Sequence, residues 1–419
     1  MGNGVSMDRV IAEFARGRIT RREAVKLLMA SGGAALFPAL GRADDTVGGI
    51  PLARPDKPVT LPTFQKPIES GLKPESGGDF HIFNYDEYVD PKLMTDFGAK
   101  YGVNVVLDIF DDIDAAITKL ANGTVQVDVT ELTNNRIAQA VAGKLLQPIN
   151  HDYIPNLKAN VWPSLHSPYY DQGSQYSVPY TVYSTGIGWR SDLVSEDIHK
   201  MDNPWSIFWQ AEKYKGHVGI LSDSREAMVL PMLYRGKLDV NTEDPAVYAA
   251  ALEDLLAMIP ICNPKITSTG YQTLPDGNTS LHHIWSGQML AAAMYNAPDG
   301  FDGRKLQYWV APPGKTPVQN DVWAVPTMAK KPVLAHLWLD FLLDNDNAYH
   351  NFVDFNGYQP PITSVTADRL IQEKLIPDTL HAALLGPDDF GPGTLQEGQL
   401  TPGGQKLVQE GYARFSSGS

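Results

Sequence analysis

The sequence predicts an α/β protein built from two lobes. The chain has 419 residues, which is enough for two ordinary domains. From residue 79 onward, short apolar runs typical of strands alternate with amphipathic patterns typical of helices. Residues 177–189 form a long, β-rich stretch with Pro179 near its start, as expected for a strand that leaves one lobe and enters another. We therefore expect a cleft between two lobes.

The residues before this pattern predict an export signal and a linker. Four arginines between residues 16 and 22 precede an apolar, small-residue run over 24–40, and Gly41-Arg42-Ala43 suits signal cleavage. Residues 20–26 resemble the twin-arginine export motif, so residues 1–43 predict a signal peptide and a periplasmic, exported protein. The alternative is a retained membrane anchor, for which the run is short and rich in glycine. Residues 44–78 lack periodicity and predict a linker.

The first predicted lobe comprises residues 79–183 and 320–365. Pro91 is suited to open a helix, and Asn122-Gly123 is suited to end one. The predicted strands cover 80–83, 103–110, 125–129, 177–189 and 321–326, and the predicted helices cover 91–98, 112–120, 134–142 and 332–343. Repeated strand–helix–strand units predict a parallel sheet with right-handed crossovers.

The second predicted lobe comprises residues 184–319 and 366–419. Asn203-Pro204 has the chemistry of a helix cap followed by a first-turn proline. The predicted elements are helices over 202–209 and 246–258, a strand over 215–221, a helix over 281–285 and a strand over 290–295. The glycine- and proline-rich end of the chain predicts only short helical stretches.

Composition and motifs exclude several function classes. A formal net charge of −14 argues against a nucleic-acid partner, whose phosphates need basic patches. The single cysteine, Cys262, cannot form an internal disulfide and suits a buried apolar position. The motifs of serine hydrolases, phosphate-binding loops, zinc proteases and Cys-x-x-Cys redox sites are missing. His282-His283 would point about 100° apart on a helix, which is unsuited to chelation. We therefore predict no enzyme, no metal site and no cofactor.

Aromatic and acidic residues at the ends of the strand patterns are the candidate site. Carboxylates accept hydrogen bonds from an organic ammonium group, while ring faces attract its charge and pack on its methylenes. The strand-end candidates are Tyr85, Tyr88, Tyr180, Tyr183, Asp223, Glu226, Trp285 and Asp321. As alternatives, Asp223 and Glu226 could cap the next helix, and Trp285 could belong to a core.

Five short motifs in this order resemble those of the periplasmic spermidine/putrescine-binding proteins of ABC importers. The resemblance covers about residues 77–362 and includes Phe83-Asn84-Tyr85-Asp86-Glu87-Tyr88, which is similar to the family's Tyr-Asn-Trp-x-x-Tyr. The other matching stretches are 178–180, 214–216 with 223–226, 284–287, and 321–326. The resemblance implies a type II-like, two-lobed periplasmic-binding-protein fold that captures a cationic amine by lobe closure. It also implies a monomer that docks on a cognate permease in the inner membrane.

The departures from the family pattern affect the expected ligand. Tyr85 and Gln319 stand where polyamine binders have tryptophan, and Asn135 falls near a position where they have tyrosine. The resemblance adds Gln319 and Asn135 to the candidate ligand-binding residues. The acidic positions are kept while the aromatic box is reduced. This pattern favours a shorter diamine, or an amine with additional polar groups, over spermidine.

Two rival interpretations remain open from the sequence. A protein of the same fold could bind ferric ion through tyrosinates such as Tyr169-Tyr170, or an anion at helix N-termini. Asp223, Glu226 and Asp321 argue against an anion. An exported enzyme is the second rival, against which the missing nucleophile–base motifs count.

Overall fold

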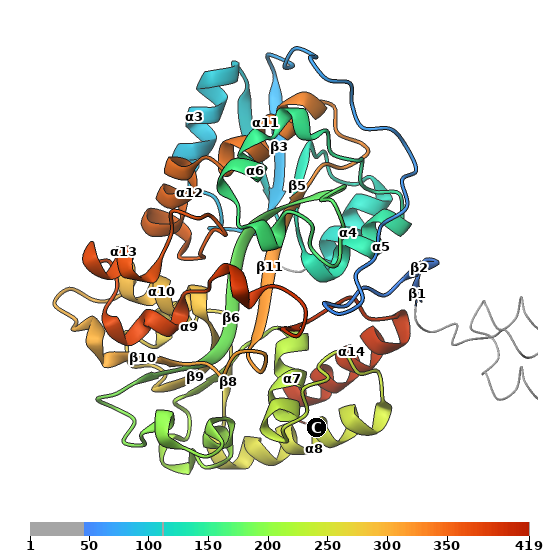
Figure 1. The fold of residues 1–419 in the computed structure, drawn as a ribbon. Coiled ribbons are helices and arrows are strands. Elements are labelled where there is room, and N and C mark those ends of the chain that lie inside the picture. The colour runs from blue at the N-terminus through green and yellow to red at the C-terminus, as the bar shows by residue number, and fades with distance from the viewer. Residues whose placement is uncertain (1–45, 111–112, 419) are drawn as a thin grey trace, which may run out of the picture. The chain divides into compact units, whose positions relative to one another are not determined.

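The computed structural model describes residues 46–110 and 113–418, and the predicted signal peptide lies outside these residues. Two strands, β6 (Ser177–Arg190) and β11 (Pro317–Ala324), run side by side through the centre of this part (Figure 1). The sheet order is β4-β3-β5-β11-β6-β9-β7-β8, with β10 added at β6 and β12 (Leu395–Gln396) added at β11. The first part of β6 pairs with β11, and its second part pairs with β9 and β10. The described residues therefore form two halves that share the central strands.

The first half contains the strands β3 (Asp79–Asn84), β4 (Asn104–Ile109) and β5 (Val129–Thr133). Its helices are α3 (Pro91–Tyr101), α4 (Ile113–Asn122), α5 (Ile137–Ala142), α6 (Pro155–Asn160), α11 (Pro332–Leu342) and α12 (Asn345–Asn351). Phe80, Ile82 and Phe83 of β3 are fully buried, as the apolar run predicts. The α3 helix begins at an Asp90 cap and Pro91 and ends at the left-handed Gly102.

The second half contains the strands β7 (Val218–Ile220), β8 (Lys265–Ile266), β9 (Leu281–Trp285) and β10 (Leu306–Trp309). Its helices are α7 (Ser224–Tyr234), α8 (Pro245–Cys262), α9 (Gly270–Thr273), α10 (Ser286–Met294), α13 (Ala367–Gln372) and α14 (Pro402–Ser417). The α8 helix is long and apolar enough to cross a membrane by length and composition. It instead packs with α7 and α14 and buries Tyr248, Leu255 and Met258, as a core helix does. Cys262 is buried at its end, as predicted.

The sheet is mixed, so the expectation of a parallel sheet is only partly right. The pairs β3–β4, β3–β5, β7–β9 and β7–β8 are parallel, whereas β5–β11, β11–β6 and β6–β9 are antiparallel. The outer strands follow the strand–helix–strand rule. Each of these antiparallel pairs contains β6 or β11, the strands that carry the chain from one half to the other and back. The strand predicted at 125–129 begins at Val129 and reaches Thr133.

The order predicted for residues 281–295 is wrong, because strand β9 precedes helix α10. His282 and His283 have no exposed surface, and β9 is buried from Leu281 to Ile284. Gly219 and Gly270 lie against the His282 ring and leave room for it. Two adjacent histidines are polar in a sequence pattern, so the pattern did not indicate a strand that is buried on both faces. The helix predicted at 202–209 is a 3₁₀ helix over Pro204–Trp209.

The described part of the segment predicted as a linker packs against the first half and contacts the C-terminal segment. The strands β1 (Thr46–Val47) and β2 (Ile50–Pro51) pair with each other, and Ile50 and Leu61 are buried. Arg54 donates to the carbonyl of Gln399 at 3.0 Å, and Glu75 accepts from two backbone amides at the start of α11. Scattered apolar residues are enough to fix an extended segment, although they give no periodic signal.

Candidate functional site

Two adjoining cavities lie at the central strands. The first, which we call the first chamber, has a volume of about 530 Å³. The second chamber has a volume of about 270 Å³. Both are lined by Tyr85, Tyr183, Ser268 and Trp285, so these residues form the boundary between the chambers.

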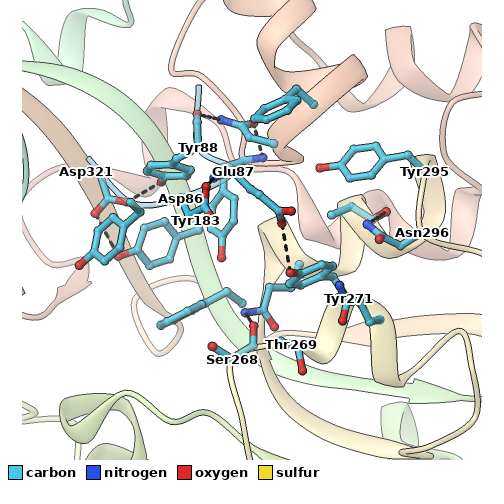
Figure 2. Close-up of a pocket in the computed structure, with 18 of the residues that line it drawn as sticks. Asp86, Glu87, Tyr88, Tyr183, Ser268, Thr269, Tyr271, Tyr295, Asn296 and Asp321 are labelled. Atoms are coloured by element: carbon cyan, nitrogen blue, oxygen red, sulfur yellow. Dashed lines mark hydrogen bonds between the residues drawn. The ribbon is translucent and has the colours of Figure 1, made fainter. Parts of the chain in front are cut away.

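The first chamber is acidic and aromatic. Its wall contains the carboxylates of Asp86, Glu87, Asp321 and Asp354, and no lysine, arginine or histidine among the described residues lines it. Its rings come from both halves: Tyr85, Tyr88, Tyr183, Tyr271, Trp285, Tyr295, Phe355 and Tyr358. Figure 2 shows Asp321 and Tyr88 on one side of this space and Tyr295 on the other. An arrangement of this kind attracts organic cations by charge and by ring faces.

A bulge in the central strands positions Asp321. Asp321 of β11 lies opposite Thr181 of β6, whereas the next residue, Val322, lies opposite Pro179. Tyr180 is therefore the extra residue of a β-bulge, and Pro179 supplies no backbone N–H there. Such irregularities re-aim neighbouring side chains, and here they accompany the carboxylate that lines the first chamber.

Hydroxyl groups hold the Asp321 carboxylate. The Tyr88 hydroxyl donates to Oδ2 at 2.6 Å and Thr181 donates to the same oxygen at 3.4 Å. The Tyr183 hydroxyl donates to Oδ1 at 3.4 Å. Burial raises the pKa of Asp321 to about 6, although these hydrogen bonds favour the charged form. The carboxylate is thus oriented by three hydroxyls, and no cationic side chain of residues 46–110 and 113–418 forms an ion pair with it.

Glu87 extends the acidic wall towards the second half. Its backbone adopts φ 51°, a left-handed conformation that is uncommon for a residue with a side chain. Tyr271 of α9 donates to its carboxylate at 3.5 Å, as Figure 2 shows. The strained turn therefore directs a second carboxylate to the mouth of the first chamber.

The second chamber surrounds the start of α7. Asp223 caps this helix, with Oδ1 accepting from the backbone amides of Arg225 at 2.8 Å and Glu226 at 2.9 Å. Glu226 is 3% exposed, and its Oε1 accepts from Thr185 at 2.7 Å and from the Trp285 indole at 2.8 Å. Burial raises the pKa values of both Asp223 and Glu226. The capping role foreseen for Asp223 is confirmed, and the residue nevertheless lines the chamber.

Nine of the ten residues predicted for the site line one or both chambers. Tyr88 and Asp321 line the first chamber, and the boundary residues are named above. The second chamber receives Asn135, Asp223, Glu226 and Gln319. Tyr180 lines neither chamber: its ring packs in the core of the first half, and its hydroxyl donates to the Tyr88 carbonyl. Because side chains alternate along a strand, Tyr180 and Tyr183 face opposite sides of β6.

Several lining residues were not foreseen from the sequence. Glu87 lies within the Phe83–Tyr88 motif, and its position between the predicted site residues Tyr85 and Tyr88 is the signal that could have marked it. No local signal marks Tyr271, Tyr295, Tyr358 or Glu397, which reach the chambers through tertiary folding. Three of these residues, Tyr271, Tyr295 and Tyr358, add rings to the first chamber beyond the predicted ones.

Tyr169 and Tyr170 have structural roles. Tyr169 donates to the carbonyl of Glu397 at 3.4 Å, and Tyr170 accepts from Asn320 at 2.6 Å. Burial raises the pKa of both phenols, which disfavours the tyrosinate form. The ferric-ion alternative therefore gains no support from this pair.

The sequence profile for bacterial extracellular solute-binding proteins matches residues 92–377. A putrescine/agmatine-binding protein of Pseudomonas aeruginosa is 28% identical over 277 residues, covering 63% of this chain and 73% of that protein. The spermidine/putrescine-binding periplasmic protein of Escherichia coli is 23% identical over 357 residues, covering 83% of this chain and 94% of that protein.

A solved structure from Listeria monocytogenes, assigned to a spermidine/putrescine ABC transporter, has a similar fold. The TM-score is 0.66 at 22% sequence identity, covering 81% of this chain and 98% of that one. The two-lobed periplasmic-binding-protein fold expected from the sequence is thus confirmed.

Proposed function

The chain belongs to the family of bacterial extracellular solute-binding proteins, and from this premise we propose that it captures a small organic amine for an ABC importer. The related proteins and the fold are those of transport components, not of enzymes. The relatives named above are polyamine-binding proteins. Their ligands guide the proposal, and the chemistry of the first chamber supports it.

The observation that carries the proposal is the burial of the Asp321 carboxylate without a cationic partner in the described part of the chain. This carboxylate is 5% exposed, and within the described part of the chain only neutral hydroxyls donate to it. A buried carboxylate without a cation is costly, and an ammonium group would supply both the charge and the N–H donors. Asp86, Glu87 and Asp354 add negative charge around the same space, which disfavours an anion.

The rings of the first chamber would hold the carbon chain of the ligand. Tyr183 and Trp285 contact each other edge-on at 5.8 Å between ring centres, and both line the two chambers. Methylenes packed on these faces leave water as the amine enters. We propose an export route through the twin-arginine system, capture outside the cytoplasm by closure of the two halves, and delivery to a cognate permease.

A thermal-shift panel tests the proposed ligand class. Diamines and triamines, amino acids, opines, sugars, carboxylates and ferric ion would each be added to the purified protein. A ligand that binds only the native state raises the melting temperature by mass action, by an amount that grows with its concentration. We expect amines alone to produce this rise at low concentration. A response to sugars, carboxylates or ferric ion without one to amines would contradict the proposal.

A further inference from the structure

A buried carboxyl group lies near Asp321 but lines neither chamber. Glu131 of β5 is 0% exposed, and neither of its carboxyl oxygens receives a hydrogen bond from the described residues. Two donors in the described part of the chain are also left over close to it, namely Nδ2 of Asn84 and Nε1 of Trp323. Polar groups without partners inside a core cost free energy, so this carboxyl calls for an explanation.

The sheet register places Glu131 beside Asp321. In the antiparallel pair of β5 and β11, Asp321 lies opposite Thr133 and Trp323 lies opposite Glu131. Residues two apart on a strand face the same side, so Glu131 is the diagonal neighbour of Asp321 on one face of the sheet. The Cβ atoms of such neighbours lie about 7–8 Å apart, a distance that long side chains can span. The Glu131 carboxyl is therefore within electrostatic reach of Asp321.

The groups of the described chain that face Glu131 supply no cation. The titratable ones are Asp321 on β11, Tyr88 in the loop after β3, and Tyr180 on β6. The Tyr88 hydroxyl donates to Asp321, and the Tyr180 hydroxyl donates to the carbonyl of Tyr88. Burial, and then the charge of Asp321, raises the pKa of Glu131 well above its usual value. Glu131 therefore keeps its proton in the ligand-free protein, and the charge of Asp321 helps to hold it.

We propose that Glu131 is a further residue of the amine site, which acts through Asp321 by exchanging its proton against the bound ammonium group. This inference rests on the proposed function, because Asp321 must hold the ammonium. Once the ammonium offsets the charge of Asp321, less repulsion holds the proton on Glu131. The Glu131 O–H bond then breaks more readily, the proton passes to solvent, and the carboxylate left behind attracts the ligand. Because this coupling is reciprocal, raising the pH strengthens amine binding.

The spacing of the two carboxyl groups limits the size of the effect. Two unit charges about 8 Å apart, at an effective dielectric constant of about 20, interact by an energy that corresponds to roughly thirtyfold in affinity. The ammonium lies beyond Asp321 and offsets only part of this interaction, so the expected change is about three- to tenfold. It falls above the titration of Asp321, whose pKa is about 6.

Calorimetry with putrescine between about pH 7 and about pH 9 tests the role of Glu131. E131Q keeps the size of the side chain and cannot ionise. We expect the ratio of the wild-type affinity to the E131Q affinity to rise by about three- to tenfold over this range. Groups that both proteins share, such as Glu226, Glu397 and the amines of the ligand, cancel in the ratio. Another amine of the thermal-shift panel replaces putrescine if only that amine binds.

A matched control is provided by Asp340 of α11. Burial raises the pKa of this half-buried carboxyl, and its side chain lines neither chamber. The D340N variant therefore also removes a carboxyl with a raised pKa from the first half. Its affinity should follow that of the wild type at every pH.

Proton release gives a second readout. At about pH 8.5, the binding enthalpy measured in buffers of different ionisation heat reports the number of protons released. E131Q should release fewer protons than the wild type, by a measurable fraction of one proton. E131M places an apolar side chain of similar size in the core and should behave like E131Q. The comparison therefore stands even if the amide group of E131Q disturbs folding.

The outcomes separate this inference from the proposed function. If the affinities of the wild type and the Glu131 variants change in parallel with pH, and their proton release is equal, the inference is overturned while the amine site stands. A loss of affinity by the same factor at every pH would assign Glu131 a purely structural role and would also overturn it. If no amine of the thermal-shift panel binds the wild type, the proposed function itself fails.

Discussion

Asp321 shows how burial and hydrogen bonding together prepare a carboxylate for a cation. Its hydroxyl partners orient the charge, while burial raises its pKa to about 6. Near neutral pH the carboxylate is mostly ionised but poorly compensated. A ligand ammonium stays protonated throughout this range, since amines of this kind have pKa values near about 10. Binding strength should therefore follow the ionisation of the protein and not that of the ligand.

The first prediction is a pH dependence of affinity. The raised pKa means that protons compete with the ligand below about pH 6, so a monoamine should bind up to about tenfold more weakly for each further pH unit. Titrations at several pH values between about 5 and 8 measure this slope. An affinity that stays constant over the whole range would show that Asp321 does not compete for protons with the ligand.

Site residues could be predicted where a local sequence pattern marks them. They were harder to predict where the direction of a side chain on its strand decides whether it reaches the site. The Tyr85 to Tyr88 stretch, Asp223, Glu226 and Asp321 were found because acidic and aromatic residues follow strand patterns. Tyr180 was selected by the same rule, but it lies on the opposite face of β6, at the bulge. Tyr180 and Tyr183 are three residues apart and so face opposite sides of one strand, but the local sequence does not state which side faces the site.

The second prediction separates Tyr180 from Tyr183. Tyr180→Phe removes the hydroxyl that accepts from Asn351 at 2.9 Å, so the free energy of unfolding should fall by about 1–2 kcal/mol. Its amine affinity should stay within about twofold. Tyr183→Leu removes a ring that lines both chambers and should weaken amine binding by about fivefold or more. Chemical denaturation and calorimetry on both variants decide this; reversed effects would place the ligand on the wrong face of β6.

At the scale of elements, β9 is a buried strand that the sequence pattern did not predict. His282 and His283 are fully buried, and the two ring nitrogens of His283 and Nε2 of His282 have no hydrogen-bond partner in the described structure. Burial lowers the pKa of His282 to about 4 and that of His283 to about 3. Both rings are therefore neutral in the folded protein, and the rings of Trp205 and Phe208 pack against His283. The apolar elements β3 and α11 could be predicted, because their apolar residues directly indicate burial.

The third prediction concerns acid stability. Below about pH 6.5 the unfolded chain protonates both histidines, whereas the folded chain does not until about pH 4 and about pH 3. Each histidine thus lowers the free energy of unfolding by up to about 1.4 kcal/mol per pH unit as the pH falls through this window. The raised pKa values of Asp321 and Glu397 act in the opposite direction, because the folded state binds protons more readily there.

A variant isolates the histidine contribution from that of the carboxylates. His283→Leu keeps an apolar side chain in the ring-lined position, so the difference from the wild type cancels the unchanged acidic groups. We expect this difference in unfolding free energy to move in favour of the variant as the pH is lowered from about 6.5 to 4.5. A difference that does not vary with pH would mean that His283 is not held neutral by burial.

At the scale of the whole described part, the two halves are joined by β6, β11 and the segment that leads to β12. The site lies where these strands cross from one half to the other, and its walls come from both. A ligand that contacts both halves favours the form in which they are closed, by the difference in its affinity for the two forms. The two-lobed arrangement could be predicted from the long β-rich stretch over residues 177–189, which corresponds to β6. The additional rings from α9, α10 and Tyr358 could be found only from the fold, because their segments are distant in the sequence.

The fourth prediction is a change in size on binding. We expect the radius of gyration from small-angle scattering to decrease when a saturating amine is added, with rotation near Tyr183-Ser184 and Gln319–Asp321. The same measurement on Asp321→Asn at the same amine concentration is the control for non-specific effects. A radius that does not change at saturation would argue against closure of the two halves.

The measurement that tests the central claim most directly is the amine affinity of Asp321→Asn. This substitution keeps the size and shape of the side chain and removes its charge, and the raised pKa of Asp321 indicates that this charge does not stabilise the folded state. Truncating one side of a buried charge pair costs about 2–5 kcal/mol, so calorimetry should show binding weakened by about 30-fold or more. Glu410→Gln, an exposed carboxylate on α14, should bind like the wild type. If Asp321→Asn binds the amine as tightly as the wild type, Asp321 is not the anchor and the cation site lies elsewhere.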